Sequence, residues 1–481
     1  PYAGFLAPDG VTEGARTLAQ QAISLAGELG EAVLIRAVAE VYIDDPVAWA
    51  AAEPGFGVVW RDGRTGMEMG AVGVRRRMQT DFDPQTELRA FLQQQRRALV
   101  QGWYGSGQPT LTELPLALGG FSFRDTPPTG NDPWAHWPLH EFVIPERMLI
   151  RWAGTPTMAV ITAEATGDDD VETVARRLAE ASASITGDPI RRNGYVNGIA
   201  PLLVPDRGES KERWCERIRS AREEFNQNEL EKVVLARRAH FTTPPASVFD
   251  PAVTLERLRQ SHPDSFVFGF RRDDGRWFLG ATPELLARVS SGRFDGHALA
   301  GTIASSNDDN EASNLARELS DSVKNQHEHA IVIRDIESAL DRHCDAVEIA
   351  RRPTVRRLAE LQHLETAVRG RVREEEALLD IVGDLHPTPA VGGHPRPAAA
   401  RYLSDNESLH RGWYASPIGW VGARGEGAFA VALRCALITP EEAVAFVGAG
   451  IVADSEPEAE WEETELKLRT ISSALAVRRL K

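Results

Sequence analysis

Apolar residues recur at helical spacing in several segments of the chain. Residues 13–29 and 86–100 carry amphipathic patterns, the second rich in Gln and Arg. Charged amphipathic patterns also cover residues 210–227 and 310–343. A last pattern runs from about 456 to 475, with Ser455 as its predicted N-cap and Pro457 in the first turn. The spacing predicts five helices, two in the first half of the chain and three in the second.

Strand patterns lie between these helices. Residues 32–41 and 56–60 are short apolar runs, and KVVLARRAHF follows the helix predicted at 210–227. SFVFGFRR and RWFLGAT flank Asp273-Asp274-Gly275, and an Asp-Gly pair between such runs is a strong hairpin signal. Near the end, WYASPIGWVG, GAFAVALRCALI and AVAFVGAGIV are joined by short turns, which predicts three antiparallel neighbours. The chain is therefore expected to be an α+β protein with large antiparallel sheets.

The first 205 residues are more weakly patterned than the rest. Residues 126–138, dense in Pro, Gly, Asp and Trp, predict an ordered surface loop. No stretch has the composition of a domain linker. We expect one domain whose N-terminal half is 1–205 and whose catalytic region is 206–481.

Composition narrows the classes of function. The 54 Lys and Arg against 70 Asp and Glu give a formal charge of −16, which disfavours nucleic acid or an anionic membrane as partner. No run is apolar enough to span a bilayer, and the first residues lack the layout of a signal peptide. The three cysteines have no metal-binding spacing. These features predict a cytoplasmic protein with reduced thiols, in which an anionic substrate needs a local positive group or a metal.

The last predicted helix carries carboxylates on one face. Glu460, Glu463 and Lys467 are spaced i, i+3 and i+7, directly after the glycines of VGAGIV. Oxygen ligands of this kind suit Mg²⁺, although a Glu- and Lys-rich terminal helix is more often simply solvated. Glu328 enters an apolar helical run, where a buried carboxylate needs a partner such as a metal. Its neighbours His327 and His329 are two apart on a helix and cannot chelate one zinc ion together.

Lys232 begins a predicted strand and Glu284 ends the strand and turn GATPELL. Taken singly, a lysine at a strand end is usually solvated and a Glu after Pro usually starts a helix. Neither position is specific by itself.

Taken in order, these segments resemble the chorismate-binding enzyme family, which includes isochorismate, salicylate and anthranilate synthases. The matching pieces are KVVLAR, GATPELL, ALAGT, HEHAIVIRD, HPTPAVGG, RGWYASPIGW, FAVALRCALI and VGAGIVADSEPEAEWEET followed by Lys467, and they span about 210–478. The resemblance implies the chorismate-binding fold, a single domain with two large antiparallel sheets packed between helices.

The resemblance also implies roles for particular residues. Glu328 and Glu463 would bind Mg²⁺, assisted through water by Glu460, and the ion would neutralise the ring carboxylate of chorismate. Asn325 stands where the family usually has Asp or Glu, so the metal site has one negative charge fewer. The implied substrate-binding residues are Gly301, Thr302, His363, Thr388, Tyr414, Arg434, Gly448, Ala449, Gly450 and Lys467.

Lys232 and Glu284 distinguish the branches of the family. Ammonia-using members carry Gln at the first position and depend on a glutamine amidotransferase. The lysine therefore implies a branch that uses water, isochorismate synthase or the salicylate synthases that share both residues, and a monomer that needs no amidotransferase subunit. Lys232 would deprotonate a water that attacks ring carbon 2, and Glu284, its pKa raised by burial, would protonate the departing C4 hydroxyl.

The same resemblance leaves other activities open. Thr282-Pro283-Glu284 favours isochorismate synthase, with salicylate synthase as the alternative. An ammonia-using aminodeoxychorismate-type synthase and a catalytically inactive chorismate-fold binding protein are further alternatives. The product of an isochorismate synthase would serve menaquinone, siderophore or salicylate synthesis.

Overall fold

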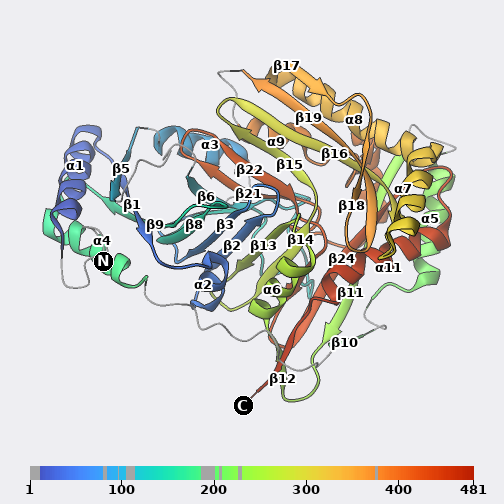
Figure 1. The fold of residues 1–481 in the computed structure, drawn as a ribbon, viewed down its shortest axis with the longest axis horizontal. Helices are drawn as coiled ribbons and strands as arrows, with labels where there is room; N and C mark the ends of the chain where they lie inside the picture. The colour runs from blue at the N-terminus through green and yellow to red at the C-terminus, as the bar shows by residue number, and fades with distance from the viewer. Residues whose placement is uncertain are drawn as a thin grey trace.

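The computed structural model describes residues 11–79, 84–95, 97–104, 114–185, 201–204, 208–225, 230–373 and 378–480. Within these ranges the chain forms two large sheets with helices packed around them (Figure 1). None of the helices in these ranges has the length and apolar character that crossing a membrane requires. The α+β class and the large antiparallel sheets agree with the prediction.

The larger sheet has 13 strands among the described residues, and its pairings are antiparallel except for β1 with β5. In spatial order its strands are β10 (Leu202–Leu203), β11 (Lys232–Thr242), β24 (Glu442–Ile451), β23 (Cys435–Ile438), β14 (Trp277–Thr282), β13 (Phe266–Arg271), β2 (Gly57–Asp62), β3 (Met67–Val72), β8 (Arg147–Arg151), β9 (Thr157–Ala165), β1 (Val33–Val41) and β5 (Leu99–Tyr104), with β20 (Gly393–His394) also paired to β11.

The second sheet has 10 strands in the described part of the chain. Its spatial order is β17 (Cys344–Ile349), β19 (Leu361–Val372), β16 (Arg293–Ala304), β15 (Leu285–Ser290), β22 (Gly427–Val431), β21 (Pro417–Gly422), β6 (Pro115–Gly120), β7 (Glu141–Ile144) and β4 (Arg76–Gln79), with β18 (Thr354–Arg357) paired to β19. A separate pair joins β12 (Ser247–Phe249) to β25 (Val477–Arg479). Strands from both halves of the chain share both large sheets, because β2 pairs with β13 and β6 pairs with β21.

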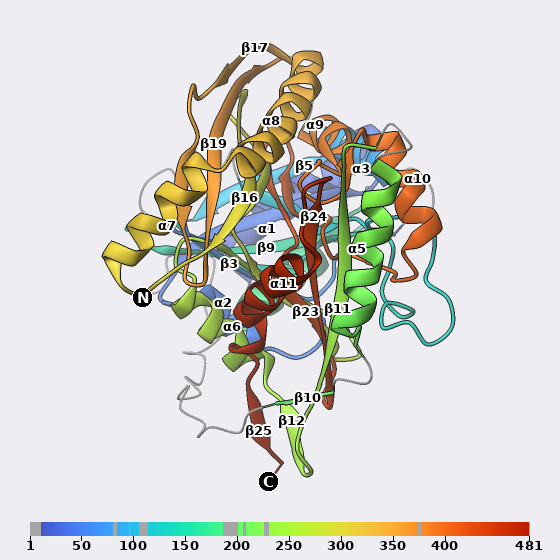
Figure 2. The ribbon, with the colours of Figure 1, turned by 90° about the vertical axis from the view of Figure 1, so that its right-hand side faces the viewer.

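Helices cover the sheets at both ends of the molecule (Figure 1). α1 and α4 pack together at one end, and α5 and α11 lie side by side at the other, as Figure 2 shows. The helices are α1 (Glu13–Leu29), α2 (Pro46–Ala52), α3 (Pro84–Gln95), α4 (Val171–Ala183), α5 (Lys211–Phe225), α6 (Pro251–Ser261), α7 (Asp309–Asp321), α8 (Val323–His343), α9 (Leu378–Leu385), α10 (Arg396–Asn406) and α11 (Pro457–Ser472).

Three helix predictions need correction. The helix predicted over 310–343 is two helices, because Ser322 is extended and its side chain caps α8 by accepting from the N–H of Asn325. The helix predicted over 86–100 ends at Gln95, since the chain then pairs with β1 as strand β5. Ser455 is not the N-cap of α11: Glu456 holds that position, and the Ser455 hydroxyl accepts from the N–H of Val452 instead.

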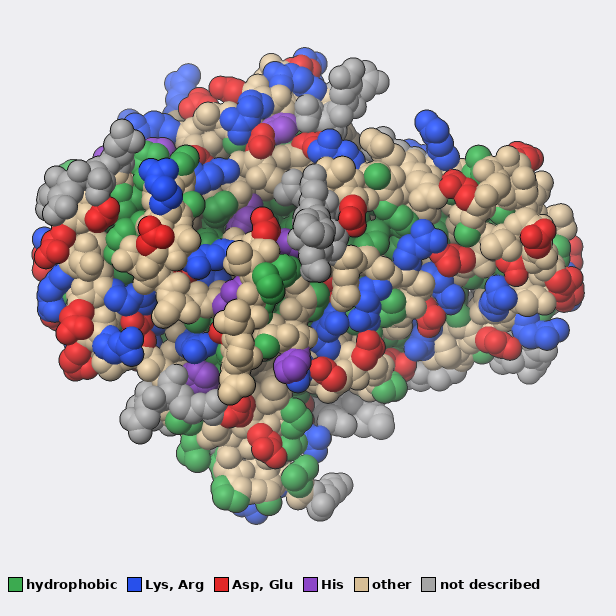
Figure 3. Space-filling model, turned by 180° about the vertical axis from the view of Figure 1, so that it is seen from behind, with side chains coloured by type: hydrophobic (Ala, Val, Ile, Leu, Met, Phe, Trp, Pro, Cys, Tyr) green, Lys and Arg blue, Asp and Glu red, His purple; other side chains and the backbone are tan. Residues whose placement is uncertain are grey.

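The loop at 126–138 is also less superficial than predicted. Trp134 and Trp137 are only 1% and 6% exposed and pack against each other edge to face. Trp134 also lies against Phe446 of β24, with ring centroids 5.3 Å apart. The loop therefore supplies part of the core between the sheets. The outer surface is different in character, and Figure 3 shows acidic and basic side chains intermingled over one whole face.

Two segments of the chain cross from one large sheet to the other. Pro283 and Glu284 connect β14 of the larger sheet to β15 of the second, and residues 432–434 connect β22 back to β23. The two crossings are hydrogen-bonded together: the N–H of Val431 donates to the Glu284 carbonyl (3.0 Å) and that of Ala281 to the Arg434 carbonyl (3.3 Å). The expectation that GAFAVALRCALI is one strand among three neighbours is therefore wrong, because its two ends belong to different sheets.

Candidate active site

A pocket open to solvent lies where the chain crosses between the sheets, and it is called the cavity below. Its walls come from β11, β16, β24, α8, α11 and the two crossings. Many residues predicted from the sequence as site residues line it, namely Glu284, Gly301, Thr302, Glu328, His363, Tyr414, Arg434, Gly448, Gly450, Glu463 and Lys467. Side chains from segments far apart in the sequence thus meet in one place.

Lys232 lies behind Glu328, one of the residues that line this cavity. It is the first residue of β11, and its side chain is 0% exposed. Its ammonium donates to the Glu328 carboxylate at 2.8 Å. A Cβ added to Gly450 would stand 2.9 Å from Lys232 Cε and 2.8 Å from Glu328 Oε1. Glycine at 450 therefore leaves the space that this buried ion pair needs.

The carboxyl group of Glu284 faces the same cavity. Burial raises the pKa of Glu284 to about 7, an effect that the positive charges of Lys232, Lys467 and Arg434 only partly oppose. The crossing fixes its backbone, since its N–H donates to the Thr282 hydroxyl (3.2 Å). As predicted from the sequence, burial gives this group the protonation behaviour of an acid near neutral pH.

Arg434 is held by His363 across the cavity. Arg434 Nη2 donates to His363 Nε2 at 3.2 Å, so the histidine proton is on Nδ1, which donates to the Gly301 carbonyl at 3.2 Å. Burial and then the Arg434 charge hold the His363 pKa well below its usual range, so the ring is neutral. Arg434 itself has a φ of +50°, a left-handed conformation set by the crossing, and Gly301 in its own strand has a φ of +76°. The arrangement leaves a buried guanidinium facing the cavity.

Tyr414 lines the cavity beside Gly448. Its ring stacks on Phe446 with centroids 5.6 Å apart and an interplanar angle of 20°. A Cβ on Gly448 would lie 2.9 Å from the Tyr414 hydroxyl oxygen. Burial raises the pKa of Tyr414, so its hydroxyl stays protonated and can donate to a bound anion.

Each of the three carboxylates predicted to bind metal has a lysine partner. Glu328 pairs with Lys232, Glu460 with Lys324 (2.8 Å) and Glu463 with Lys467 (2.6 Å). Burial raises the pKa of Glu460, and the neighbouring charge of Glu463 raises it further. Burial opposes ionisation of Glu328 too, but the Lys232 charge and hydrogen bond outweigh it and lower its pKa.

These carboxylates offer the oxygen ligands that Mg²⁺ prefers, and they stand close enough to one another for all three to act on Lys324. Among the described residues no three acidic, His or Cys side chains converge on a single point as a complete metal cage. Because Mg²⁺ usually keeps waters and substrate oxygens among its ligands, a partial set of this kind fits it.

Comparison with known proteins agrees with this site. A family model described as "Chorismate binding enzyme" matches residues 20–476. The chain belongs to the chorismate-binding enzyme family. It is 31% identical over 462 residues to isochorismate synthase MenF of Bacillus subtilis, covering 94% of this chain and 96% of that one. It is 42% identical over 268 residues to the salicylate biosynthesis isochorismate synthase of Pseudomonas aeruginosa, a match to 56% of each chain.

A solved structure shares the fold of this chorismate-binding enzyme. The menaquinone-specific isochorismate synthase from Escherichia coli superposes with a TM-score of 0.75 at 24% identity, covering 94% of this chain and 100% of that one. Both the family and the chorismate-binding fold predicted from the sequence are confirmed.

Four predicted site residues of this chorismate-binding enzyme do not line the cavity directly. Lys232 reaches it through Glu328, and Glu460 is turned to Lys324. Thr388 is buried, and its hydroxyl has no hydrogen-bond partner in the described part of the chain. The side chain of Ala449 points to the opposite side of β24, into the cluster with Leu235, so only its backbone could contact a ligand.

The structure also adds residues that sequence reasoning left without a role. Lys324, in the first turn of α8, forms an ion pair with Glu460. The next residue, Asn325, donates from its side-chain amide to the Ser322 hydroxyl at 3.0 Å. Arg411 of the RGWY segment is 1% exposed and pairs with Glu407. In the sequence, the position of Arg411 directly before an apolar strand motif could have marked it as a residue of interest. Only the fold shows that its side chain is buried.

Proposed function

We propose that this protein is an isochorismate synthase, which adds a hydroxyl from water at ring carbon 2 of chorismate and releases the hydroxyl of ring carbon 4. The observation that carries the proposal is a buried carboxyl with a pKa of about 7 that lines a cavity, together with a fully buried lysine that reaches this cavity through Glu328. The relatives named above, which carry isochorismate synthase names, support the same reaction.

Lys232 and Glu284 would divide the proton transfers between them. Lys232 would act as the neutral amine, after its ammonium has given a proton to solvent. The amine takes a proton from a water whose oxygen bonds to carbon 2, the ring double bonds shift, and the C4 hydroxyl departs as water with the proton of Glu284. The reaction consumes one water and releases one, so it is an isomerisation. Glu284 ends as a carboxylate and Lys232 as an ammonium, and proton exchange with solvent restores both. A carboxyl with a pKa near 7 donates readily at neutral pH.

The remaining polar groups would orient the substrate's two carboxylates. Arg434, held by His363, and the Tyr414 hydroxyl would bind the enolpyruvyl carboxylate, the guanidinium by a bidentate contact. The backbone of Gly448–Gly450 and the Lys467 ammonium, which already donates to the Gly448 carbonyl at 3.0 Å, would add contacts. Gly301, Thr302 and Thr388 would shape the opposite side.

Glu328, Glu463 and Glu460 would hold Mg²⁺. When bound, the ion would neutralise the ring carboxylate of chorismate, which an acidic protein needs if it is to bind a dianion. Burial raises the Glu460 pKa and the charge of Glu463 raises it further, and the negative charge gathered here supports a cation at this place. Asn325 in place of an acidic residue would leave that cation with less countercharge.

We also infer that the enzyme acts as a single chain, as a monomer without an amidotransferase, and in the cytoplasm. Lys232 instead of Gln supports the first inference, and three buried cysteines that form no disulfide support the last.

Product analysis tests the proposal. Purified protein is incubated with chorismate and Mg²⁺ at neutral pH, and the products are separated by HPLC while pyruvate is followed with lactate dehydrogenase. A plateau of chorismate and isochorismate, reached from either side, is the expected result. Stoichiometric salicylate and pyruvate would show a salicylate synthase instead, and no turnover would leave only a binding protein.

A further inference from the structure

Among the residues that the structure describes, strand β11, which begins with the buried Lys232, has no continuous neighbour on one of its two edges. β24 pairs with it along nearly its full length on one side. On the other side β20 pairs only with Lys232 and Val233, and β10 only with Phe241 and Thr242. Between these short pairings the polar backbone groups of β11 need other partners, because an unpaired buried amide is costly.

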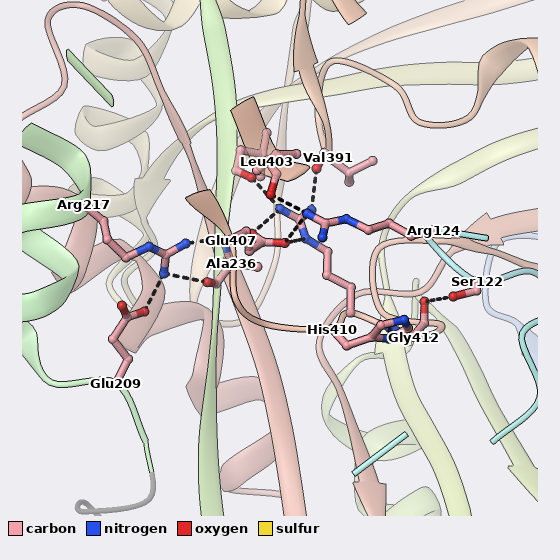
Figure 4. Close-up of polar contacts among 12 residues, drawn as sticks. Ser122, Arg124, Glu209, Arg217, Ala236, Val391, Leu403, Glu407, His410 and Gly412 are labelled. Atoms are coloured by element: carbon pink, nitrogen blue, oxygen red, sulfur yellow. Dashed lines mark hydrogen bonds and ion pairs between the residues drawn. The ribbon is translucent and has the colours of Figure 1, made fainter. Parts of the chain in front are cut away.

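Two buried charged side chains, those of Arg411 and Glu407, and the half-buried side chain of Arg217 fill that gap (Figure 4). Arg411 Nη2 donates to the Val234 carbonyl at 2.6 Å. Glu407 Oε2 accepts from the N–H of Ala236 at 3.2 Å, and Arg217 donates to the Ala236 carbonyl at 3.0 Å. The three side chains thus replace a stretch of edge strand with contacts specific to this strand position.

Arg411 also reaches a second wall of the cavity. Its Nη1 donates to the Val391 carbonyl at 2.8 Å, and both Val234 and Val391 line the cavity. Its Nε and Nη2 form a bidentate pair with Glu407, each at 2.7 Å. The guanidinium carbon lies 4.2 Å from the centre of the Phe123 ring, which covers it. Every nitrogen of this side chain therefore has a hydrogen-bond partner, and its position is determined.

We propose that Arg411 is a positioning residue, oriented by Glu407, that fixes the distance between the strand carrying Lys232 and the turn carrying Val391. This inference rests on the proposed function, since it concerns the placement of the proposed general base. Arg411 does not line the cavity and touches none of the reacting groups. It acts only through the two backbone segments that it joins.

A lysine at 411 cannot reproduce this arrangement. The planar guanidinium offers five N–H donors in fixed directions, whereas an ammonium on a flexible stem cannot bridge two carbonyls and a carboxylate in the same geometry. Arg411→Lys keeps the charge that Glu407 needs, so it removes the bridging with the least disturbance to the ion pair. This variant therefore tests the bridging separately from the charge.

Arg271 provides a matched control. It is 7% exposed and likewise donates to backbone carbonyls, those of Gly55 (2.5 Å), Ala51 (3.2 Å) and Ala50 (3.3 Å), but it lies on β13 away from the cavity lining. Arg271→Lys therefore loses a comparable buried network that has no connection to the proposed base.

The experiment compares kcat and KM of parent, Arg411→Lys and Arg271→Lys with chorismate and Mg²⁺, well below the melting temperature of each. Because small misplacements of reacting groups can cost about 100-fold, Arg411→Lys should lower kcat about 10- to 100-fold while KM changes less than about threefold. Arg271→Lys should keep kcat within about twofold of the parent, since it shifts the melting temperature without moving β11.

Other outcomes are decisive as well. A folded Arg411→Lys with parental kcat, or equal losses in both variants, would overturn the proposal. If Arg411→Lys does not fold, Glu407→Gln, which keeps an oxygen facing Ala236, takes its place with the same expectation, and failure of both to fold would show a folding role instead. The parent's product is identified first. Absence of isochorismate there refutes the proposed function, whereas the role of Arg411 is judged on whichever product the parent makes.

Discussion

Replacing Glu284 with glutamine should greatly lower the turnover number and, above neutral pH, stabilise the protein. Glu284 is 5% exposed, and burial raises the pKa of its carboxyl from an ordinary 4.5 to about 7. A carboxyl whose pKa is higher in the folded chain binds its proton more tightly there. Its stabilising contribution is therefore complete below about pH 4.5 and is lost as the pH rises through about 7.

The size of the effect follows from the two pKa values. At about 1.4 kcal/mol for each pKa unit, the difference between 4.5 and about 7 corresponds to roughly 3 kcal/mol of unfolding free energy lost from the parent by pH 8. The amide of the Glu284→Gln variant is neutral at every pH, so the variant avoids this loss. With an unfolding entropy of about 2 cal/mol/K per residue, a chain of 481 residues should gain roughly 3 °C in melting temperature.

The assay is calorimetric melting of parent and Glu284→Gln at pH 5 and pH 8, with Glu216→Gln on the exposed face of α5 as control. We expect a difference at pH 8 that shrinks at pH 5, and none for the control. In parallel, kcat of the variant should fall by about 10²–10⁴-fold, because a neutral amide cannot protonate the departing hydroxyl. Equal melting shifts at both pH values, or a variant with parental turnover, would refute the reasoning.

Three further changes test the rest of the site. Lys232→Ala should lower kcat by about 10²–10⁴-fold, because the proposed general base is lost. Ammonium added to the parent enzyme should give little aminated product, and aminated chorismate as its main product would contradict the assignment. Treatment with EDTA should abolish turnover and Mg²⁺ restore it, and Glu463→Gln should weaken Mg²⁺ binding measured by calorimetry with chorismate present. Full activity in metal-free buffer would argue against the metal site. Gly301→Ala should lower kcat/KM about tenfold, because a left-handed backbone costs a side chain about 1–2 kcal/mol and the new Cβ would stand 3.1 Å from that of Asn325. An unchanged kcat/KM would show that catalysis does not depend on the position of the Gly301 carbonyl.

Local patterns determined much of this protein. The spacing of apolar residues predicted α1 and α5 closely, and Asp-Gly predicted the hairpin of β13 and β14. Helical spacing also put Glu463 and Lys467 on one face, where they pair at 2.6 Å. These features depend on residues a few positions apart, so they can be read along the chain. The order of short motifs was enough to identify the family.

Tertiary structure alone decided the features that depend on distant partners. Whether GAFAVALRCALI stays in one sheet or crosses to the other depends on its pairing with strands β15 and β24. That crossing places Arg434, and the one at Pro283 places Glu284. The lysine partners of the three carboxylates, and the burial that raises the Glu284 pKa to about 7, arise only when these segments close around one cavity. Burial and long-range charge are properties of the assembled fold, so no pattern along the chain contains them.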